Sequence, residues 1–388
     1  MVDAVLTLNS GSSSVKFGLF ECGEVPVELM SGQVSGLGGD ARIDIKTPDG
    51  KTLQNKDLID STTHVDALRA ILDSLPQYAE FGSIVGVGHR IVFGGPELDR
   101  PAVLDDALLK KLEVYVPFAP LHQPYNLAGV RAAREAFPNA VQVGCFDTAF
   151  HRDNDWVHEA FALPRHFYES GVRRYGFHGL SYQFISEELG RKHPTVAKGR
   201  VVVAHLGNGA SMCALREGLS VDSTMGFTAL DGLPMGTRCG ALDPGVVLYM
   251  VDQLGMSPNE VTDVLYKQSG LKGLSGIGND MRELLNSTEE SARQAISYFV
   301  ERIRRELGAL TAVLGGLDAF VFCGGIGENA APIRERVCAG FEWLGIELDT
   351  QRNADGGPVI TSDASVTQVL VINTDEEWVI ARAASSCV

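Results

Sequence analysis

Short apolar runs separated by small or polar residues predict a strand-rich first part of the chain. Residues 3–9 and 15–20 are two such runs, and the turn of small residues between them is typical of a β-hairpin. Residues 42–46 alternate between polar and apolar positions and precede Asp49-Gly50, which predicts a second hairpin. A longer apolar run at 83–92 indicates a buried strand.

Helical spacing and helix-start signals become more frequent further along the chain. Residues 63–75 carry apolar positions at helical intervals. Three pairs have the spacing of a capping box, which predicts where helices begin: Ser257 with Glu260, Ser287 with Glu290, and Thr374 with Glu377. The second pair is predicted to open a long helix that ends at Gly315-Gly316. One apolar stripe follows that helix: Ala295, Ile296, Phe299, Ile303, Leu307, Leu310 and Leu314.

The second half also repeats the plan of the first. VLTLNSGSSSVKFGLF (5–20) and VVVAHLGNGASMCALREG (201–218) each contain an apolar strand, an Asn, a run of small residues and a second apolar strand. Further strands are predicted at 319–323 and 368–372, with a turn at 324–329 and a helix from Ala331. Alternating strands and helices with a repeated module indicate an α/β protein with two similar domains.

A polar stretch with Pro164, at 148–170, interrupts the pattern and suggests a domain boundary. We therefore expect one domain at 1–150 and another at 151–373. A chain of 388 residues that is 45% hydrophobic can bury a core in each of them.

The acidic composition narrows the range of partners. A net charge of −16 repels phosphate backbones and anionic lipids, so we expect neither nucleic acid nor a membrane as a partner. Seven dispersed cysteines without a CxxC pair indicate free thiols. With no basic and apolar leader at the start of the sequence, they favour a cytoplasmic location.

Three turns are candidates for binding phosphate or nucleotide. Small residues and hydroxyls in the turn after Asn9, followed by Lys16, offer closely spaced donors to an anion. The turn at 205–211 (HLGNGAS) has the same character, and GGIGEN at 324–329 lies between a strand and a helix, where ligands bind in α/β folds. Each turn by itself could equally be an ordinary tight connection, but three in strand-turn contexts favour a nucleotide.

Charged residues in apolar surroundings are candidates for chemistry. Arg90 and Arg238 lie among glycines and apolar residues, where a guanidinium can bind a carboxylate or phosphate in a bidentate manner. The alternative for both is a structural ion pair. Asp147 could act in catalysis or cap a helix. Glu376 is a candidate Mg²⁺ ligand because Glu377 is assigned to the capping box. His122, His178 and His205 are more typical of core histidines.

Eight motifs in order resemble the acetate kinase family: LTLNSGSSSVKF, GHRIVFGG, CFDTAFH, RRYGFHGLSY, VVVAHLGNGAS, DGLPMGTRCGALDPG, FCGGIGENA and NTDEEW. They span Val5 to Trp378. The resemblance implies two domains of the acetate and sugar kinase, Hsp70 and actin type, a duplicated ribonuclease H-like fold with a nucleotide cleft between the domains. The second domain would bind nucleotide and form a homodimer, and the last helix, about 374–388, would return to the first domain.

The resemblance also assigns roles to residues of this sequence. The implied catalytic residues are Arg90, His122, Asp147, His178 and Arg238. Arg90 and an acyl pocket would bind the substrate, and the pocket positions are Val92, Leu121, Phe177 and Ala229. ATP would be bound by Ser12, Ser14, Lys16, His205, Leu206, Gly207, Asn208, Gly209, Gly324, Gly325, Ile326, Gly327 and Asn329. The implied metal is Mg²⁺, with Mn²⁺ as an alternative, at Asn9 and Glu376.

Two positions depart from the family pattern. Ala229 stands where the family usually has Pro, and Phe93 stands where it usually has His. The implied reaction is Mg²⁺-dependent, reversible and direct transfer of the ATP γ-phosphate to acetate, giving acetyl phosphate and ADP. Propionate or another short-chain carboxylate is the first alternative substrate, since the motifs do not separate the two activities. An ATPase module of the Hsp70 or actin type is a more distant alternative.

Overall fold

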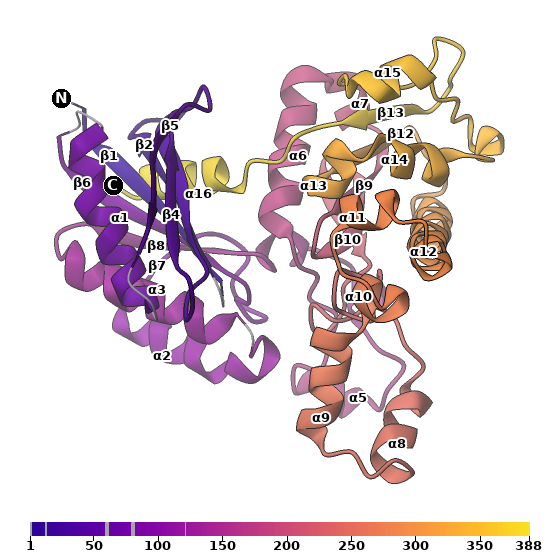
Figure 1. Ribbon diagram of the computed structural model, residues 1–388, viewed down its shortest axis with the longest axis horizontal. Helices are drawn as coiled ribbons and strands as arrows, with labels where there is room; N and C mark the ends of the chain where they lie inside the picture. Colours follow the sequence, from indigo (N-terminus) through magenta and orange to yellow (C-terminus); the bar gives the residue numbers. More distant parts are fainter. Residues whose placement is uncertain (1, 12–13, 59–61, 79–81, 121) are drawn as a thin grey trace. The chain divides into compact units, whose positions relative to one another are not determined.

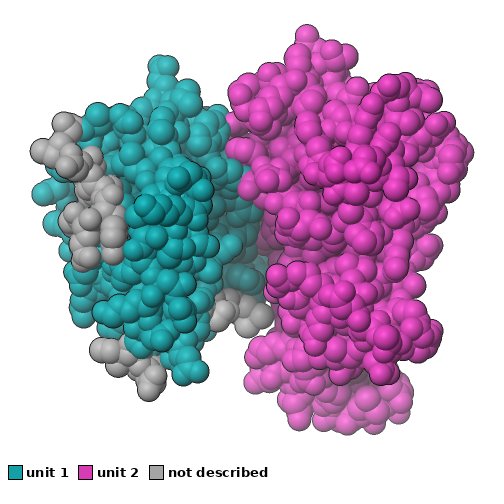
Figure 2. Space-filling view, turned by 45° about the horizontal axis from the view of Figure 1, so that its top comes forward, with its two compact units in different colours: residues 1–152, 375–388 teal, residues 153–374 magenta. Residues whose placement is uncertain are grey.

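The computed structural model describes residues 2–11, 14–58, 62–78, 82–120 and 122–388. The chain divides into two compact units, which we call unit 1 (Met1–Arg152 and Asp375–Val388) and unit 2 (Asp153–Thr374). Figure 2 shows these units in different colours. Each unit contains one β-sheet with helices packed against it (Figure 1).

The sheet of unit 1 has the strand order β5-β4-β3-β2-β1-β6-β8-β7. Its strands are β1 (Ala4–Ser10), β2 (Ser14–Glu21), β3 (Val27–Ser35), β4 (Arg42–Lys46), β5 (Thr52–Asp57), β6 (Ile84–Ile91), β7 (Ala102–Val103) and β8 (Val141–Phe146). The first five strands pair in antiparallel fashion, which confirms both predicted hairpins. The β1–β6 and β6–β8 pairs are parallel, so the ends of these three strands meet at one edge.

The helices of unit 1 are α1 (His64–Tyr78), α2 (Asp106–Val114), α3 (Gln123–Ala136), α16 (Glu376–Ser385) and the 3-10 turns η1 (Val116–Phe118) and η2 (Ala149–His151). The C-terminal helix α16 packs on β1, β6 and β8, although hundreds of residues separate them in sequence. A Cβ at Gly88 of β6 would lie 2.4 Å from Ile380 Cγ2, so a glycine is needed for this close packing. Burial of α16 against the sheet therefore brings Glu376 into unit 1.

The sheet of unit 2 has the order β11-β10-β9-β12-β13. Its strands are β9 (Arg200–Leu206), β10 (Ala210–Arg216), β11 (Leu219–Ser223), β12 (Ala319–Cys323) and β13 (Gln368–Val371). The β9–β10 hairpin is antiparallel, whereas β12 runs parallel to β9 and β13. This pattern repeats the order and directions of β3-β2-β1-β6-β8, so the two units are built on one module, as the repeated sequence plan predicts.

Unit 2 has helices both before and after the strands β9, β10 and β11 in the chain. They are α4 (Trp156–Glu159), α5 (Arg165–Glu169), α6 (Gly179–Lys192), α7 (Pro194–Ala197), α8 (Pro244–Asp252), α9 (Pro258–Asp263), α10 (Gly270–Ser275), α11 (Met281–Asn286), α12 (Glu290–Leu314), α13 (Gly324–Asn329), α14 (Ala331–Cys338), α15 (Thr350–Asp355), the π-helical turn η3 (Val264–Gln268) and the 3-10 turn η4 (Glu342–Leu344). The predicted apolar stripe of α12 is buried along its whole length.

Of the three predicted capping boxes, one is confirmed and two are wrong. Ser257 and Glu260 form the reciprocal bonds of a box at the start of α9. Ser287 instead follows the last residue of α11 and closes that helix, and α12 begins at Glu290 without a side-chain cap. Residues 324–329, predicted as a turn, form the short helix α13.

Two global features follow from the described residues. The seven cysteines are free thiols, as predicted. In the part of the chain that the model describes, no helix has the length and apolar character of a membrane span.

Candidate active site

In unit 1 the predicted site residues converge on Arg90, at the end of β6. Its Nε and Nη2 donate to the two carboxylate oxygens of Asp147 at 2.9 and 2.6 Å, a bidentate pair. Asp147 follows β8, which runs parallel to β6, and its side chain is almost completely buried. The structural ion pair that the sequence left open is therefore present, and the alternative role of Asp147 as a helix cap is not observed.

The third nitrogen of Arg90 faces two further oxygen-bearing side chains. Nη1 donates to Asn9 Oδ1 at 3.4 Å and lies 3.6 Å from Glu376 Oε2. Asn9 is on β1 next to β6, and Glu376 is the first residue of α16. Burial by itself lowers the pKa of Arg90, but the negative charges of Asp147 and then Glu376 outweigh this effect and raise the pKa. The guanidinium therefore remains a permanent cation beside three oxygen-bearing groups.

Two amide side chains that the sequence analysis missed hold the backbone around this cluster. Asn126 Oδ1 accepts a hydrogen bond from Val92 N at 3.0 Å, and its Nδ2 donates to Ser10 O at 2.7 Å. Gln123 bonds the N–H and the carbonyl of Phe93 at 3.3 and 3.0 Å. Both amides lie in the first turn and a half of α3: Gln123 directly follows His122, and Asn126 comes three positions later. Their signal in the sequence was two polar residues at buried helical positions.

The unusual Phe93 has a structural explanation. Its side chain is fully buried, stacks on Phe118 with ring centroids 5.1 Å apart and meets Tyr115 edge-on at 5.4 Å. The aromatic ring thus belongs to the core of unit 1 rather than to the charged cluster. Val92, a predicted pocket residue, is also buried. Leu121 and Ser12 lie outside the described residues.

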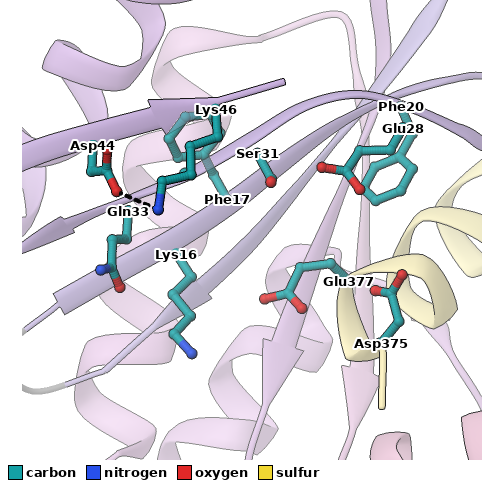
Figure 3. Close-up of a pocket in the computed structure, with 11 residues that line it drawn as sticks. Lys16, Phe17, Phe20, Glu28, Ser31, Gln33, Asp44, Lys46, Asp375 and Glu377 are labelled. Carbon is teal, nitrogen blue, oxygen red and sulfur yellow. Dashed lines mark ion pairs between the residues drawn. The ribbon is translucent and has the colours of Figure 1, made fainter. Parts of the chain in front are cut away.

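The start of α16 differs from its prediction. Asp375 caps the helix by accepting from Trp378 N at 2.9 Å, so the predicted Thr374–Glu377 box is wrong. Glu377 instead lines a cavity of about 360 Å³ in unit 1 with Lys16, Glu28 and Asp375 (Figure 3). Burial raises the pKa of Glu377, the charge of Glu376 raises it further, and Lys16 lowers it. Lys16 and Ser14 both lie on β2, and Lys16 pairs with Asn9 across the first hairpin.

In unit 2 the β9–β10 hairpin brings His178 and Arg238 together. A Cβ at Gly209 would lie 2.8 Å from Arg238 Nη2 and 3.2 Å from His178 Nε2, so a side chain at this position would displace the arginine from its present place. The ring of His205 stacks on that of His178 with centroids 4.3 Å apart. Arg238 Nη1 donates to the carbonyl oxygen of Ala229 at 2.7 Å, which places the unusual alanine beside this arginine.

His178 is held in a strained conformation by buried hydroxyls. Its φ of 56° is left-handed, a region that non-glycine residues rarely adopt and that often marks functional positions. Its Nδ1 is 2.9 Å from Ser211 Oγ, which also contacts the Tyr182 hydroxyl. Burial raises the pKa of Tyr182 well above its ordinary value, so the phenol remains protonated. Sequence analysis missed Ser211 and Tyr182, although both lie within the quoted motifs.

The β9–β10 hairpin and α13 contain the predicted nucleotide-binding positions of unit 2. Gly207 and Gly324 lie near each other: a Cβ at Gly207 would be 3.9 Å from Gly325 N, and one at Gly324 would be 2.8 Å from Leu206 O. Asn208 Oδ1 accepts from Asn279 Nδ2 at 2.9 Å, and Asn329 Nδ2 donates to Gly325 O at 2.9 Å. Three predicted positions can present only their backbone, because the side chain of Leu206 is buried and Gly324 and Gly327 have none. Phe177 is buried, whereas Ile326 is half-buried.

Comparison with known proteins gives consistent results over the whole chain. A model of the acetokinase family matches residues 4–382. An acetate kinase from Methylocella silvestris is 54% identical over 392 residues, covering 98% of this chain and 97% of that protein. An acetate kinase from Nitrobacter hamburgensis is 49% identical, covering 98% and 95%.

Solved structures are similar in fold as well as in sequence. A propionate kinase from Francisella tularensis has a TM-score of 0.92 at 36% identity, covering 99% of this chain and 100% of that one. An acetate kinase from Porphyromonas gingivalis has a TM-score of 0.88 at 35% identity, covering 99% of each chain.

Proposed function

The chain belongs to the acetokinase family, and on that premise we propose that it transfers the γ-phosphate of ATP to acetate, producing acetyl phosphate and ADP. The enzyme is a phosphotransferase with a carboxyl group as acceptor. The observation that carries the proposal is the convergence of Asn9, Asp147 and Glu376 on Arg90. These positions are the ones that the family resemblance assigns to substrate, catalysis and metal.

The chemistry follows from the charges of the reactants. Acetate is already ionised at neutral pH, so its oxygen can attack the γ-phosphorus without a strong general base. An O–P bond forms as the bond from phosphorus to the β,γ-bridging oxygen breaks, and ADP leaves. Because both reactants are anions, catalysis depends on alignment and charge neutralisation. We infer a direct in-line transfer, with no phosphoenzyme.

Each charged or polar side chain receives a role in this scheme. Arg90 and Arg238 hold the carboxylate and the transferring phosphoryl group, and His178 donates to the phosphoryl oxygens, with assistance from His122. Asp147 fixes the orientation of Arg90 through its bidentate pair. Ser14, Lys16, the β9–β10 turn and α13 bind ATP.

The metal ion of the reaction is Mg²⁺ in this proposal, with Mn²⁺ as its substitute. Asn9 Oδ1 and Glu376 Oε2 lie near the same guanidinium nitrogen of Arg90, and both are oxygen donors of the kind that Mg²⁺ prefers. Among the described residues, no three His, Cys, Asp or Glu side chains form a metal-holding group. This donor set therefore suits an ion held by Asn9, Glu376, water and phosphate. When bound, the ion neutralises phosphate charge.

Propionate is the second candidate acceptor. Alanine is smaller than the usual proline at position 229, and the carbonyl oxygen of Ala229 contacts Arg238. Val92, Leu121, Phe177 and Ala229 would line the pocket for the acyl chain. A structurally similar protein is named a propionate kinase. A single methylene is discriminated by only about 1–3 kcal/mol even in a well-shaped pocket.

The surface of unit 2 supports a homodimer. Helix α8 has no buried residue, and four of its apolar side chains are exposed: Val246, Leu248, Tyr249 and Val251. An apolar helix exposed to water typically marks an interface. We propose that a second copy of the chain covers it, in the cytoplasm. Light scattering coupled to gel filtration, on wild type and on Leu248→Glu, tests this assembly.

A hydroxylamine assay tests the proposed activity. Purified protein is mixed with ATP, Mg²⁺ and acetate, and acyl phosphate is trapped as the hydroxamate. Hydroxamate formation that requires both acetate and ATP supports the kinase. ATP hydrolysis that is independent of any carboxylic acid would instead support an ATPase module of the Hsp70 or actin type. Retention of ³²P on the protein after incubation with γ-labelled ATP would contradict direct transfer.

A further inference from the structure

Glu328 makes two backbone contacts that neither its motif nor the proposed mechanism explains. One carboxylate oxygen, Oε1, accepts hydrogen bonds from Gly324 N at 2.8 Å and from Thr374 N at 3.1 Å. Gly324 is the first residue of α13 and has a left-handed φ of 73°. Thr374 lies 46 positions after Glu328 in the chain, beyond β13. A single side chain thus joins the first residue of α13 to the segment that follows the last strand.

Thr374 is held through its side chain as well as its backbone. Its Oγ1 is 2.8 Å from Ser181 Oγ, and Ser181 Oγ is 2.8 Å from His205 Nδ1. Ser181 is fully buried on α6. The network therefore extends from α13 through Thr374 to His205, at the second predicted phosphate-binding turn.

The position of Thr374 in the chain gives this network a functional meaning. Thr374 is the last residue of unit 2, and the next two residues are Asp375, the cap of α16, and Glu376, the proposed Mg²⁺ ligand. A single residue, Asp375, therefore separates Thr374 from Glu376 in the covalent chain. Fixing Thr374 N and Oγ1 removes the local rotational freedom with which this segment would otherwise move.

We propose that Glu328 is a positioning residue that ties the nucleotide-binding helix α13 to Thr374, and so fixes the start of the segment that carries the metal ligand Glu376. This inference rests on the proposed function of α13 in binding ATP. Glu328 does not touch the reacting atoms. It acts through charge-assisted hydrogen bonds to two amides, which are stronger than neutral ones.

A substitution of Glu328 can be interpreted because α13 has a second support. The buried Arg334 donates from Nη1 to the carbonyl oxygens of Gly327 and Glu328 at 2.9 and 2.8 Å, and from Nη2 to Asn353 O. These bonds use the backbone of Glu328 and do not involve its side chain. Removing the carboxylate therefore releases Gly324 N and Thr374 N while the C-terminal end of α13 stays fixed.

The test compares Glu328→Ala with Glu328→Gln, using Glu335→Ala on the neighbouring helix α14 as a matched control at an exposed glutamate. Calorimetric titration with MgADP, without acetate, measures nucleotide binding directly. Steady-state kinetics then give the KM for ATP, the KM for acetate and the Mg²⁺ concentration at half-maximal rate. A thermal melt of each variant measures the folded population.

For Glu328→Ala we expect about tenfold weaker MgADP binding and a similarly raised KM for ATP and Mg²⁺ requirement, because two bonds to a charged acceptor are lost. The KM for acetate should stay within about twofold. Glu328→Gln keeps a carbonyl oxygen that can accept both amides, so it should bind MgADP within about threefold of wild type. Glu335→Ala should match wild type.

Two results would overturn the inference. In one, Glu328→Ala lowers the melting temperature or kcat while MgADP affinity and Mg²⁺ requirement stay unchanged, which identifies a purely structural residue. In the other, Glu328→Gln is as impaired as Glu328→Ala, which excludes the two accepted bonds as the cause. If wild type forms no hydroxamate but MgADP binding still depends on Glu328, the proposal that acetate accepts the phosphoryl group fails, and the positioning role of Glu328 stands.

Discussion

Units 1 and 2 have the same five-strand order but hold their candidate site residues in different ways. In unit 1, Arg90 is fixed by carboxylates from two other segments, Asp147 after β8 and Glu376 at the start of α16. In unit 2, His178 is fixed by the neutral hydroxyl of Ser211 and by stacking on His205. The shared module determines where the hairpins lie, while the residues that follow each strand determine the chemistry.

This difference has an energetic consequence. A buried ion pair contributes its stability only while both partners are present, because a single buried charge is costly. A neutral hydroxyl contact is worth less and can be lost at a smaller cost in stability. Substitutions in unit 1 should therefore change stability and activity together, whereas those at Ser211 should act mainly on activity.

The largest effect is expected for the arginines. Arg90→Ala or Arg238→Ala should each lower kcat by about a hundredfold or more, since each removes a preorganised positive charge from an anionic transition state. Arg90→Ala should also destabilise the protein by about 3–5 kcal/mol, because the buried carboxylate of Asp147 loses its bidentate bonds to the guanidinium. Steady-state kinetics and urea unfolding measure the two effects.

Two further variants test this interpretation of the arginines. Lysine at either position should restore little activity, because a point charge lacks the bidentate fork. The double variant Arg90→Ala/Asp147→Ala should regain part of the stability lost by Arg90→Ala. A kcat within a few-fold of wild type for either alanine variant would remove that arginine from the mechanism.

A second expected effect concerns acid stability in unit 1. Burial lowers the pKa of His89 from 6.5 to about 4, although the hydrogen bond to Gln142 raises it in part. The unfolded chain therefore binds a proton below pH 6.5 that the folded chain does not, and stability falls as pH drops from 6.5 towards 4. The loss approaches about 1.4 kcal/mol per pH unit.

Denaturant unfolding at pH 7.5 and 5.0 tests the role of His89. His89→Gln should lose less stability than wild type between these values, because the titrating group is gone. His166→Gln, at an exposed position of unit 2, serves as the control and should behave like wild type. Equal pH dependence in His89→Gln and wild type would contradict the assignment.

A smaller effect is expected in unit 2. Ser211→Ala removes the hydroxyl between His178 and Tyr182 and should lower kcat by about threefold to tenfold, the equivalent of one hydrogen bond of 0.5–1.5 kcal/mol. The KM for acetate should stay within about twofold. Ser186→Ala is a matched control, because Ser186 lies on α6 eight positions after His178 and its hydroxyl bonds Gly218 O. An unchanged kcat for Ser211→Ala would show that the hydroxyl of Ser211 is not needed to orient His178.

The smallest effect concerns the acyl pocket. Propionate should have a kcat/KM within about tenfold of acetate, because one added methylene changes binding by about 0.8 kcal/mol where there is room for it. Ala229→Pro should sharpen the preference for acetate, and butyrate should remain poor with both proteins. Hydroxamate assays with the three acids measure this. Rejection of propionate by more than about a hundredfold lies near the upper end of what a well-shaped pocket achieves for one methylene and would contradict a wider pocket.

Local patterns in the sequence predicted the elements that depend on near neighbours. Both hairpins, the capping box at Ser257 and the buried stripe of α12 follow from residues a few positions apart. The eight motifs likewise identified the family and all the residues gathered around Arg90. The hairpins, the capping box and the helical stripe are encoded within short windows, because the interactions or periodicity that define them involve residues close in sequence.

Only the tertiary structure decided which polar groups meet across long separations. Thr374 was predicted to cap the last helix, yet its hydroxyl bonds Ser181, 193 positions away, and Asp375 takes the cap. Residues 324–329 form a helix instead of a turn. The Glu328 side chain accepts from Gly324 N at its start, and Arg334 donates to the carbonyl oxygen of Gly327 near its end. Such bonds depend on how strands and helices pack, and a polar residue takes whichever partner burial leaves beside it. No local window contains that information.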